Sequence, residues 1–310
     1  MTTHMKYTLI IPHYNDTARL DRLLKTVPIV RTDVEVIVVD DCTPQQIKLI
    51  TLKEAWTSVN WLSTPKNSGA GAARNVGLLN ATGKYLVFAD SDDEFLLGAF
   101  DIFDACIKEG DELVYFLSES KQEVDNTDSV RASGFNKICL EYLEKKTPQT
   151  LEKIKLEHVV PWAKVYSKIA IDKLNINFSE TSVSNDVEFN VLSAIQIEKT
   201  RVIPRVVYRV YRRGGSLTAD STAEAFLERM KVAANLAMKL KKLKVSSRPS
   251  ATGYILKSLS YDLETILKTI YIGVFSDLRL NIFRVFIPRR WFAFFHKQRA
   301  DKSEKAAADK

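Results

Sequence analysis

The sequence contains little cysteine, little histidine and no long apolar run. Its three cysteines, Cys42, Cys106 and Cys139, are odd in number and widely spaced, which favours a reducing compartment over a disulfide framework. The four histidines have no shared spacing, so we assign them no catalytic role. No stretch of about eighteen uncharged apolar residues exists, so we predict no membrane-spanning helix. The apolar run at residues 7–12 is too short for a signal peptide.

The chain has 310 residues, of which 45% are hydrophobic and 27% charged. This ordinary globular composition has room for one large α/β domain plus appendages, or for two domains. The net charge of +7 is unevenly spread, because residues 268–299 carry seven Lys or Arg and one acid, a surplus of +6. The basic character therefore belongs to a C-terminal patch, and we predict no nucleic-acid partner.

Apolar runs alternate with helical patterns through residues 6–117. The runs lack polar alternation, as do strands buried on both faces of a mainly parallel sheet. This order predicts a doubly wound α/β half. We expect strands at residues 7–12, 34–39, 59–62, 85–89 and 113–117, and helices near 20–27, 44–56, 72–79 and 96–107.

The pattern from residue 118 onward is weaker. Residues 118–157 are polar, and we expect a loop and a helix near 135–145. Further along we expect an apolar run at 159–166, a helix at 184–197, a strand at 202–211, a basic glycine loop at 212–218, and helices from residue 223 with breaks near 246–249 and at Pro288.

Four acids directly follow the predicted strand at 85–89. Parallel α/β sheets bind ligands at the carboxyl ends of their strands, so these acids stand where a ligand is expected. Asp90 and Asp92 can share one divalent cation, because hard cations accept carboxylate oxygens together with substrate phosphates. The alternative is that the acids only cap the predicted helix at 96–107, where negative charge is favourable.

Four segments occur in a fixed order at the ends of predicted strands: residues 11–16, 38–43, 67–75 and 88–93. Together they resemble the family 2 glycosyltransferases, inverting enzymes that use nucleotide-diphosphate sugars. The resemblance is close over residues 6–95 and loose but continuous to residue 218. It implies a GT-A fold, a Rossmann-like doubly wound α/β sheet, here with a C-terminal helical extension.

The resemblance assigns roles in binding the donor. Asp92 is implied to ligate Mn²⁺ or Mg²⁺ directly, while Asp90 holds ribose or a metal-bound water. Asp41 is implied to accept a hydrogen bond from uracil, although it is also a candidate turn-forming residue. Pro12 and Tyr14 are implied to line the base pocket. The implied nucleotide-sugar contacts are Pro12, Tyr14, Asp16, Asp41, Lys66, Gly69, Arg74, Asp90, Ser91, Asp92, Arg212 and Ser216.

Some positions leave alternatives open. Gly69 and Gly71 lack the third glycine of a dinucleotide fingerprint, so we expect them to let the backbone pass close to the nucleotide. Arg74 either counters phosphate charge or pairs with a nearby acid. Arg212 and Arg213 resemble a loop that closes over the diphosphate, but the histidine that completes the metal shell in many relatives is absent.

An inverting transfer needs a base that takes the proton of the acceptor hydroxyl. The resemblance places this base at Asp186, where Asn185 departs from the usual acid and leaves Glu188 as a weaker candidate. The alternative is that Asp186 merely caps the predicted helix. Trp162 and Lys164 match a Pro-Trp-x-Lys segment on the acceptor side, where an aromatic face can stack on a sugar ring.

The C-terminal region combines charge with an apolar stripe. From Tyr271 apolar residues repeat at helical spacing, and basic residues with clustered aromatics follow at 289–297. This pattern favours a helix on an anionic lipid surface. The alternatives are a helix packed on the catalytic domain or a homodimer contact. Residues 300–310 are predicted to be disordered.

We therefore interpret residues 1–218 as a catalytic domain, with a nucleotide-sugar-binding half at 6–117 and an acceptor half at 118–218. A helical region at 219–299 follows. The predicted function is inverting transfer from a UDP-hexose or UDP-N-acetylhexosamine to a hydroxyl of a glycan or lipid-linked acceptor. Such an enzyme would serve capsule, O-antigen or lipopolysaccharide synthesis in the cytoplasm, at the inner face of the membrane.

Two alternatives to this function remain. The first is a non-catalytic sugar-nucleotide-binding or scaffold subunit, which Asn185 and the missing histidine would suit. The second is a nucleotidyltransferase of similar fold. Such an enzyme needs a glycine-rich basic loop after the first strand, and residues 13–16 do not provide one.

Overall fold

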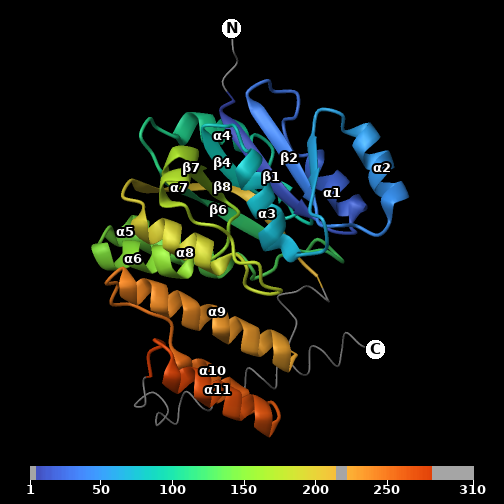
Figure 1. Ribbon diagram of the computed structural model, residues 1–310. Coiled ribbons are helices and arrows are strands. Elements are labelled where there is room, and N and C mark those ends of the chain that lie inside the picture. Colours follow the sequence, from blue (N-terminus) through green and yellow to red (C-terminus); the bar gives the residue numbers. More distant parts are fainter. Residues whose placement is uncertain (1–4, 214–221, 281–310) are drawn as a thin grey trace. The chain divides into compact units, whose positions relative to one another are not determined.

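The computed structural model describes residues 5–213 and 222–280. The chain divides into two compact units, Met1–Asp220 and Ser221–Lys310 (Figure 1). The predicted contact residue Ser216, the aromatic and basic segment at 289–297 and the predicted disordered end at 300–310 lie outside the described residues.

The first unit is built on an eight-stranded sheet with the order β3-β2-β1-β4-β7-β6-β8-β5. Neighbouring strands from β3 to β4 are parallel: β1 (Tyr7–His13), β2 (Val34–Asp40), β3 (Asn60–Ser63) and β4 (Tyr85–Phe88). Every residue of β1 and β4 is buried. This confirms the parallel, doubly wound half that the continuous apolar runs predicted.

The other half of the sheet is mixed. Its strands are β6 (Leu113–Gln122), β7 (Lys164–Ser167), β8 (Thr200–Arg212) and the short β5 (Glu94–Phe95). β7 lies antiparallel between β4 and β6, whereas β6 and β8 are parallel. The predicted division at residue 117 therefore cuts through β6, which bonds to strands of the later half and not to β4.

Helices cover both faces of this sheet (Figure 1). One apolar cluster joins Leu9 and Ile11 to α1, α2 and α4, and the other joins Ile10 to α5, α6 and α8. Adjacent residues of β1 thus point to opposite faces, as the two-residue period of a strand requires. The helices are α1 (Thr17–Leu24), α2 (Gln46–Ala55), α3 (Gly69–Asn80), α4 (Ala99–Cys106), α5 (Ser133–Lys145), α6 (Pro148–Glu157), α7 (Lys168–Leu174) and α8 (Val187–Gln196).

Several boundaries differ from the sequence expectations. α3 begins at Gly69, within the segment expected to be loop. α4 begins at Ala99 rather than near residue 96, because Gly98 has a φ of +76° and the residues before it bond to β8. The apolar run at 159–166 becomes a strand only from Lys164, since Ala163 has a φ of +54°. β5, α6 and α7 were not predicted.

The second unit is helical, as predicted. It contains α9 (Ala223–Lys242), α10 (Ala251–Ser258) and α11 (Leu263–Phe275), each begun by a capping side chain, from Thr222, Ser250 and Asp262 respectively. The predicted break near 246–249 separates α9 from α10. Within the described residues, no helix combines the length and the apolar character needed to cross a bilayer.

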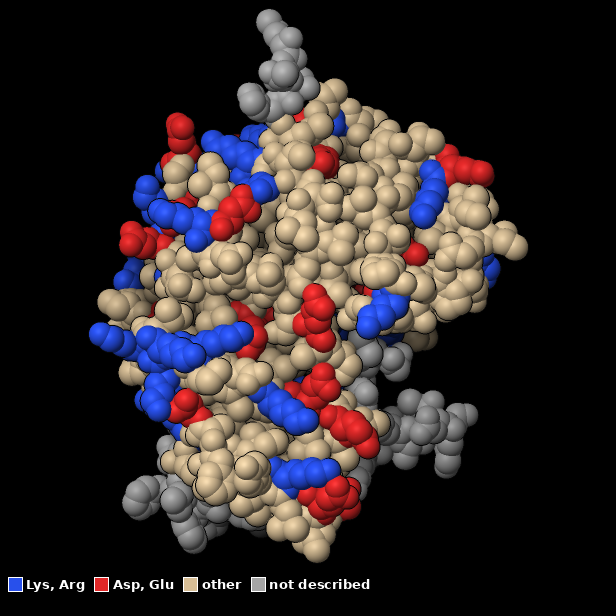
Figure 2. Space-filling view, viewed as in Figure 1, with Lys and Arg blue, Asp and Glu red and all other residues tan. Residues whose placement is uncertain are grey.

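Charges of both signs share the surface. On the face drawn in Figure 2, basic and acidic side chains are interspersed with wide uncharged areas. This face therefore lacks the continuous basic stripe by which nucleic-acid-binding surfaces are recognised.

Candidate active site

Asp90, which follows β4, is held by one residue of helix α3 and one residue of strand β8. Asp90 Oδ1 accepts a hydrogen bond of 2.5 Å from Nη2 of Arg74 on α3. The backbone N–H of Asp90 donates to the hydroxyl of Tyr208 on β8 at 2.9 Å. Tyr208 is buried and stacks on the ring of Trp162. The first carboxylate of the Asp-x-Asp pair is therefore fixed by residues distant in the sequence.

The next two acids have different surroundings. Asp92 Oδ2 lies 3.4 Å from Nε of Arg213, and burial together with the charge of Asp90 raises the pKa of Asp92. Asp93 is buried and accepts a 2.9 Å hydrogen bond from the backbone N–H of Tyr211. Burial raises the pKa of Asp93 well above its usual value, and the neighbouring acids add to the effect. Asp93 thus stabilises the β8 contact, while Asp92 remains half-buried beside Asp90.

The carboxylates of Asp90 and Asp92, which follow β4, are the type of ligand that hard divalent cations accept. Within residues 5–213 and 222–280, no three or more His, Cys, Asp or Glu side chains are arranged to hold a metal. Mn²⁺ and Mg²⁺ also take phosphate oxygens and water, however, so one or two carboxylates suffice in a phosphate site. Burial first, and then the negative charge of Asp90, raises the pKa of Asp92, and a nearby cation would oppose both effects by favouring the charged carboxylate.

Arg74 connects the donor side to the predicted base. Its guanidinium is buried, bonds to Asp90, and donates from Nη1 to Asn185 Oδ1 at 3.0 Å. It also lies 5.3 Å from the ring centre of Phe178. Of the two roles left open by the sequence, pairing with an acid is the one that the structure shows. The arginine thereby ties α3 to the segment that precedes Asp186.

Two glycines in the first turn of α3 serve the protein's own backbone. A Cβ added to Gly71 would lie 2.1 Å from the carbonyl oxygen of Ser179, so only glycine permits this approach. Gly69 has a φ of +86°, and its N–H donates to Asp41 Oδ2 at 2.6 Å. The expectation that Gly71 makes room for a nucleotide is therefore corrected, because the space belongs to Ser179.

Asp41 caps α3 from the end of β2. Its carboxylate accepts from the backbone N–H groups of Ser68 and Gly69 and from the hydroxyl of Thr64, at 2.6 to 3.2 Å. The side chain is 3% exposed. A negative group at a helix N-terminus is stabilising, which explains an acid here without a ligand. The contact to uracil stays a prediction.

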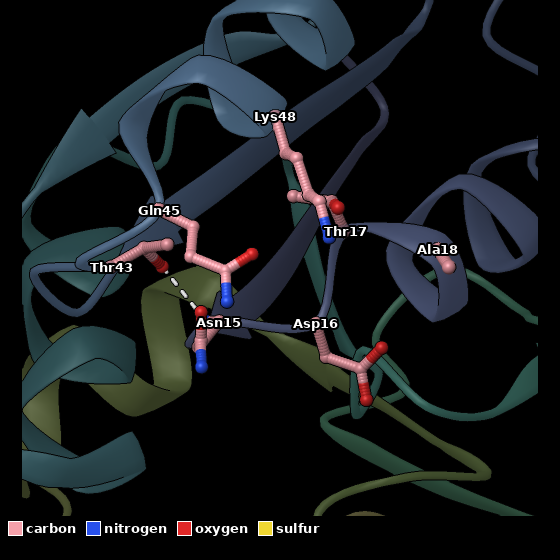
Figure 3. A pocket seen from close by; sticks show the side chains of 7 residues that line it. All are labelled: Asn15, Asp16, Thr17, Ala18, Thr43, Gln45 and Lys48. Carbon is pink, nitrogen blue, oxygen red and sulfur yellow. Dashed lines mark hydrogen bonds between the residues drawn. The ribbon is translucent and has the colours of Figure 1, made fainter.

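A small pocket lies between the ends of β1 and β2 (Figure 3). Its volume is about 120 Å³, well below the roughly 300–1,000 Å³ of a complete ligand site. The N–H of Asn15 donates to Thr43 Oγ1 at 2.8 Å and joins the two loops. The lining residues are Asn15, Asp16, Thr17, Ala18, Thr43, Gln45 and Lys48.

Of these lining residues, the sequence singled out only Asp16. Their common signal is position, since all of them follow the carboxyl end of β1 or β2. Asp16 also caps α1 by accepting from the N–H of Arg19 at 3.4 Å. Beside the pocket, Tyr14 is exposed, whereas Pro12 is buried within β1.

Two other predicted donor contacts lie on the loops. Lys66 is exposed, and its carbonyl oxygen accepts from the hydroxyls of Thr64 and Ser68. Ser91 is half-buried between the two carboxylates of the Asp-x-Asp pair. Both side chains remain accessible to a ligand.

Arg213, rather than Arg212, reaches the acids. Arg212 is exposed at the end of β8. Arg213 Nη1 lies 3.3 Å from Asp16 Oδ2, while its Nε lies 3.4 Å from Asp92. One arginine therefore bridges the loop after β1 and the Asp-x-Asp pair, at the place where a diphosphate would bring further negative charge.

Asp186 stands at the N-terminus of α8, yet its side chain makes no capping hydrogen bond. The alternative role of a helix cap is therefore not what the structure shows. Burial raises the pKa of Asp186 to about 6, with Asp90 adding to the rise and Arg74 and Lys164 opposing it. A carboxylate with a pKa near 6 is ionised at neutral pH and is a better proton acceptor than an ordinary aspartate.

Glu188, the weaker candidate for the base, is committed elsewhere. Its Oε2 accepts a hydrogen bond of 2.8 Å from the hydroxyl of Ser179, and the side chain is 7% exposed. This contact holds the segment before α8 against the helix. Glu188 is thus a packing residue in this arrangement, whereas Asp186 is half-buried.

Trp162 and Lys164 are both enclosed in the first unit. Trp162 is 1% exposed and packs between Tyr208 and Phe135. Lys164 is fully buried, and its ammonium donates to the carbonyl oxygen of His158 and to Asn190 Oδ1. Neither side chain is accessible to a sugar in this arrangement, so the acceptor contacts expected of them do not fit it.

The family follows from comparison with known proteins. Residues 8–174, more than half of the chain, match the model of glycosyl transferase family 2. The chain belongs to this family. The mixed α/β sheet with its covering helices agrees with this assignment.

Curated relatives are similar over a shorter stretch. Poly(ribitol-phosphate) beta-N-acetylglucosaminyltransferase TarS of Staphylococcus aureus is 37% identical over 95 residues, which cover 29% of this chain and 16% of TarS. Minor teichoic acid biosynthesis protein GgaB of Bacillus subtilis is 28% identical over 124 residues, 38% of this chain and 13% of GgaB. The chain thus matches only about a sixth of the length of these relatives.

Solved structures show the same fold. S. aureus TarS 1-349 in complex with UDP-GlcNAc aligns with a TM-score of 0.60 at 22% identity, over 86% of this chain and 79% of that one. The mannosyltransferase PcManGT from Pyrobaculum calidifontis, in complex with GDP-Man and Mn2+, aligns with a TM-score of 0.52 at 13% identity. That match covers 87% of this chain and 74% of PcManGT.

Proposed function

We propose that this chain transfers a sugar with inversion, from a UDP-hexose or UDP-N-acetylhexosamine to a hydroxyl of a glycan or lipid-linked acceptor of a surface polysaccharide. The observation that carries this proposal is Asp186, a half-buried carboxylate without a capping bond, with a pKa of about 6. The names of TarS and GgaB, which refer to surface polymers, support the class of acceptor.

The residues divide the work of this reaction. Asp186 takes the proton of the acceptor hydroxyl as its oxygen attacks the anomeric carbon. The bond from that carbon to the diphosphate breaks, and the diphosphate leaves with the electron pair. Arg213 lies where it can counter this charge. When bound by Asp90 and Asp92, Mn²⁺ or Mg²⁺ supplies Lewis-acid stabilisation of the leaving group.

The direct test is the release of UDP. With Mn²⁺ and a panel of UDP-sugars, we expect one donor to be consumed and to release UDP, faster when a membrane glycan fraction supplies the acceptor. A coupled assay for UDP measures this. Binding of UDP without consumption of any donor would support a non-catalytic sugar-nucleotide-binding subunit instead.

We further propose that the second unit binds the membrane surface, and α11 supports this. Its inward positions are small or polar, namely Thr265, Thr269 and Gly273. Six of its eight large apolar side chains are exposed, and their spacing places them on one face, whereas Ile266 and Ile272 are half-buried. The exposed six are Leu263, Leu267, Ile270, Tyr271, Val274 and Phe275.

The charge of this region favours a lipid surface, and not a second copy of the chain, as the binding partner of this face. Residues 268–299 carry a surplus of +6, so a second copy of the chain would bring two like-charged segments together. An anionic leaflet instead attracts each basic residue by about 1 kcal/mol. Exposed apolar side chains in a sequence segment of such charge are typical of a helix that lies in the headgroup layer.

Vesicle binding tests this proposal. The triple variant Leu267→Ser, Tyr271→Ser, Phe275→Ser is expected to bind phosphatidylglycerol-containing vesicles at least about tenfold more weakly, because each side chain loses roughly 1.5–3 kcal/mol of burial. The matched control changes three exposed apolar residues of the first unit, Leu79→Ser, Leu97→Ser and Val124→Ser, and is expected to bind normally.

Two further measurements complete the vesicle experiment. High salt is expected to weaken binding of the natural sequence, since the attraction to lipid is screened. If the α11 variant binds vesicles normally but loses a dimer seen by light scattering, the face serves a second copy and the membrane proposal is wrong.

A further inference from the structure

Lys164, the most deeply buried basic side chain among the described residues of the first unit, forms no direct ion pair with a described acid. Lys164 is 0% exposed, and among the described residues no carboxylate lies within 4.0 Å of its ammonium. Its Nζ donates to the carbonyl oxygen of His158 at 2.6 Å and to Asn190 Oδ1 at 2.9 Å, and lies 4.9 Å from the ring centre of Tyr115. Burial lowers the pKa of Lys164 well below its usual value. Burying an amine in this way is costly unless its hydrogen bonds are satisfied.

The side chain of Asn190 connects Lys164 to the N-terminus of α8 through hydrogen bonds. Its Oδ1 accepts from Lys164 and also from the hydroxyl of Tyr166 at 2.6 Å. Two donors at Oδ1 fix the orientation of the amide, because Nδ2 must then face the other way. Nδ2 donates to the carbonyl oxygen of Asp186 at 2.8 Å, and the backbone N–H of Asn190 donates to the same oxygen at 3.0 Å.

This arrangement restrains the backbone of Asp186 and not its carboxylate. Among the described residues, the side chain of Asp186 has no capping hydrogen bond, so its direction depends on the backbone from which it projects. A carboxylate that takes a proton must lie within hydrogen-bond reach of the acceptor hydroxyl. A displacement of about 1 Å can cost about a hundredfold in rate.

We propose that Asn190, held by Lys164 and Tyr166, is a positioning residue that fixes the first turn of α8 and thereby aims Asp186 at the acceptor. This proposal rests on the proposed function, in which Asp186 is the base. It also gives Lys164 a role in the acceptor half without contact to the acceptor. Lys164 fixes the side-chain amide of Asn190 by a hydrogen bond, and that amide in turn bonds to the backbone carbonyl of Asp186.

The test is an isosteric change of one atom. Asn190→Asp keeps an oxygen for Lys164 and Tyr166 but replaces the Nδ2 donor with an oxygen that faces the Asp186 carbonyl. We expect kcat, measured well above pH 6 where Asp186 is ionised, to fall about tenfold to a hundredfold. The donor KM and the affinity for UDP are expected to stay nearly unchanged. Ser193→Ala is the matched control on the same helix. It removes the hydrogen bonds from the Ser193 hydroxyl to the carbonyl oxygens of Phe189 and Asn190, leaves the Nδ2 bond in place, and is expected to retain kcat within about threefold.

A measurement without substrate separates this proposal from the proposed function. Hydrogen exchange in Asn190→Asp is expected to quicken at the first turn of α8 and to stay unchanged in α1 and α3. If no donor is ever consumed, the proposed function fails, yet the exchange result still decides whether Asn190 anchors the helix. An Asn190→Asp variant with normal kcat, or with unchanged exchange in α8, overturns the positioning role. Equal losses in kcat and in affinity for UDP, with exchange quickened throughout, also overturn it, because they indicate general damage.

Discussion

Asp186→Asn is expected to lower kcat by about 10²–10⁴-fold, the usual contribution of a positioned general base. Asparagine keeps the shape of the side chain but cannot take the proton of the acceptor hydroxyl. The affinity for UDP is expected to stay nearly unchanged, because the pocket at Asn15 and Thr43 and the Asp-x-Asp pair belong to other strand ends. Steady-state kinetics and a UDP titration separate the two quantities.

The matched control for this change is Glu188→Gln. Glutamine can still accept the hydrogen bond from Ser179, so we expect a much smaller loss of kcat. If Asp186→Asn turned over normally and Glu188→Gln were inactive, the base would be Glu188 and the assignment to Asp186 would be wrong.

The pH profile of kcat/KM provides a second readout of the same base. Burial raises the pKa of Asp186 to about 6, and the carboxylate must be ionised to act. Activity is therefore expected to be full above about pH 7, half-maximal near pH 6, and to fall about tenfold per pH unit below that. If kcat/KM instead fell only near pH 4, where an ordinary aspartate titrates, the base would not be a buried carboxylate with a raised pKa.

Asp92→Asn is expected to lower metal-dependent turnover by at least about a hundredfold. Lewis-acid stabilisation contributes several kcal/mol, and each 1.36 kcal/mol corresponds to a factor of ten. The fold is expected to survive, because Asp92 is half-buried and the ion pair that its carboxylate forms with Arg213 is long, at 3.4 Å. Initial rates across a Mn²⁺ titration measure the effect.

Asp93→Asn is the matched control for this change. Burial already favours the protonated carboxyl of Asp93, and asparagine can accept the same bond from Tyr211. We expect nearly normal turnover and metal dependence. A rate for the natural sequence that chelation with EDTA leaves untouched would refute the metal assignment. The arginines would then counter the charge of the diphosphate alone.

Much of the fold follows from local sequence patterns. The runs that became β1, β2 and β4 are apolar at successive positions, so each had to be buried on both faces. The acids that follow β2 and β4 could be placed as well, because parallel sheets bind ligands at the carboxyl ends of their strands. The family resemblance then supplied Asp186, which no local pattern distinguishes from a helix cap.

Other features depend on contacts between distant segments. An aromatic residue two positions before a lysine suits a sugar-binding surface equally well, and only the packing of Phe135 and Tyr208 shows that Trp162 is buried. Arg213 reaches Asp16 across nearly two hundred residues of sequence. The capping role of Asp41 likewise needs α3 to approach the end of β2.

The place of β7 in the sheet has a consequence for how the chain reaches its native state. β4 and β6 are complete by residue 122, but the strand between them, Lys164–Ser167, comes more than forty residues later. During synthesis, therefore, one edge of β4 and one edge of β6 present unpaired N–H and C=O groups until β7 is made. Such edges invite pairing with other chains. Pairing of distant strands is also slow, because loop closure precedes the gain from contacts. Docking of β7 thus covers the open edge of β4, whereas the other edge of β6 stays unpaired until β8 is made.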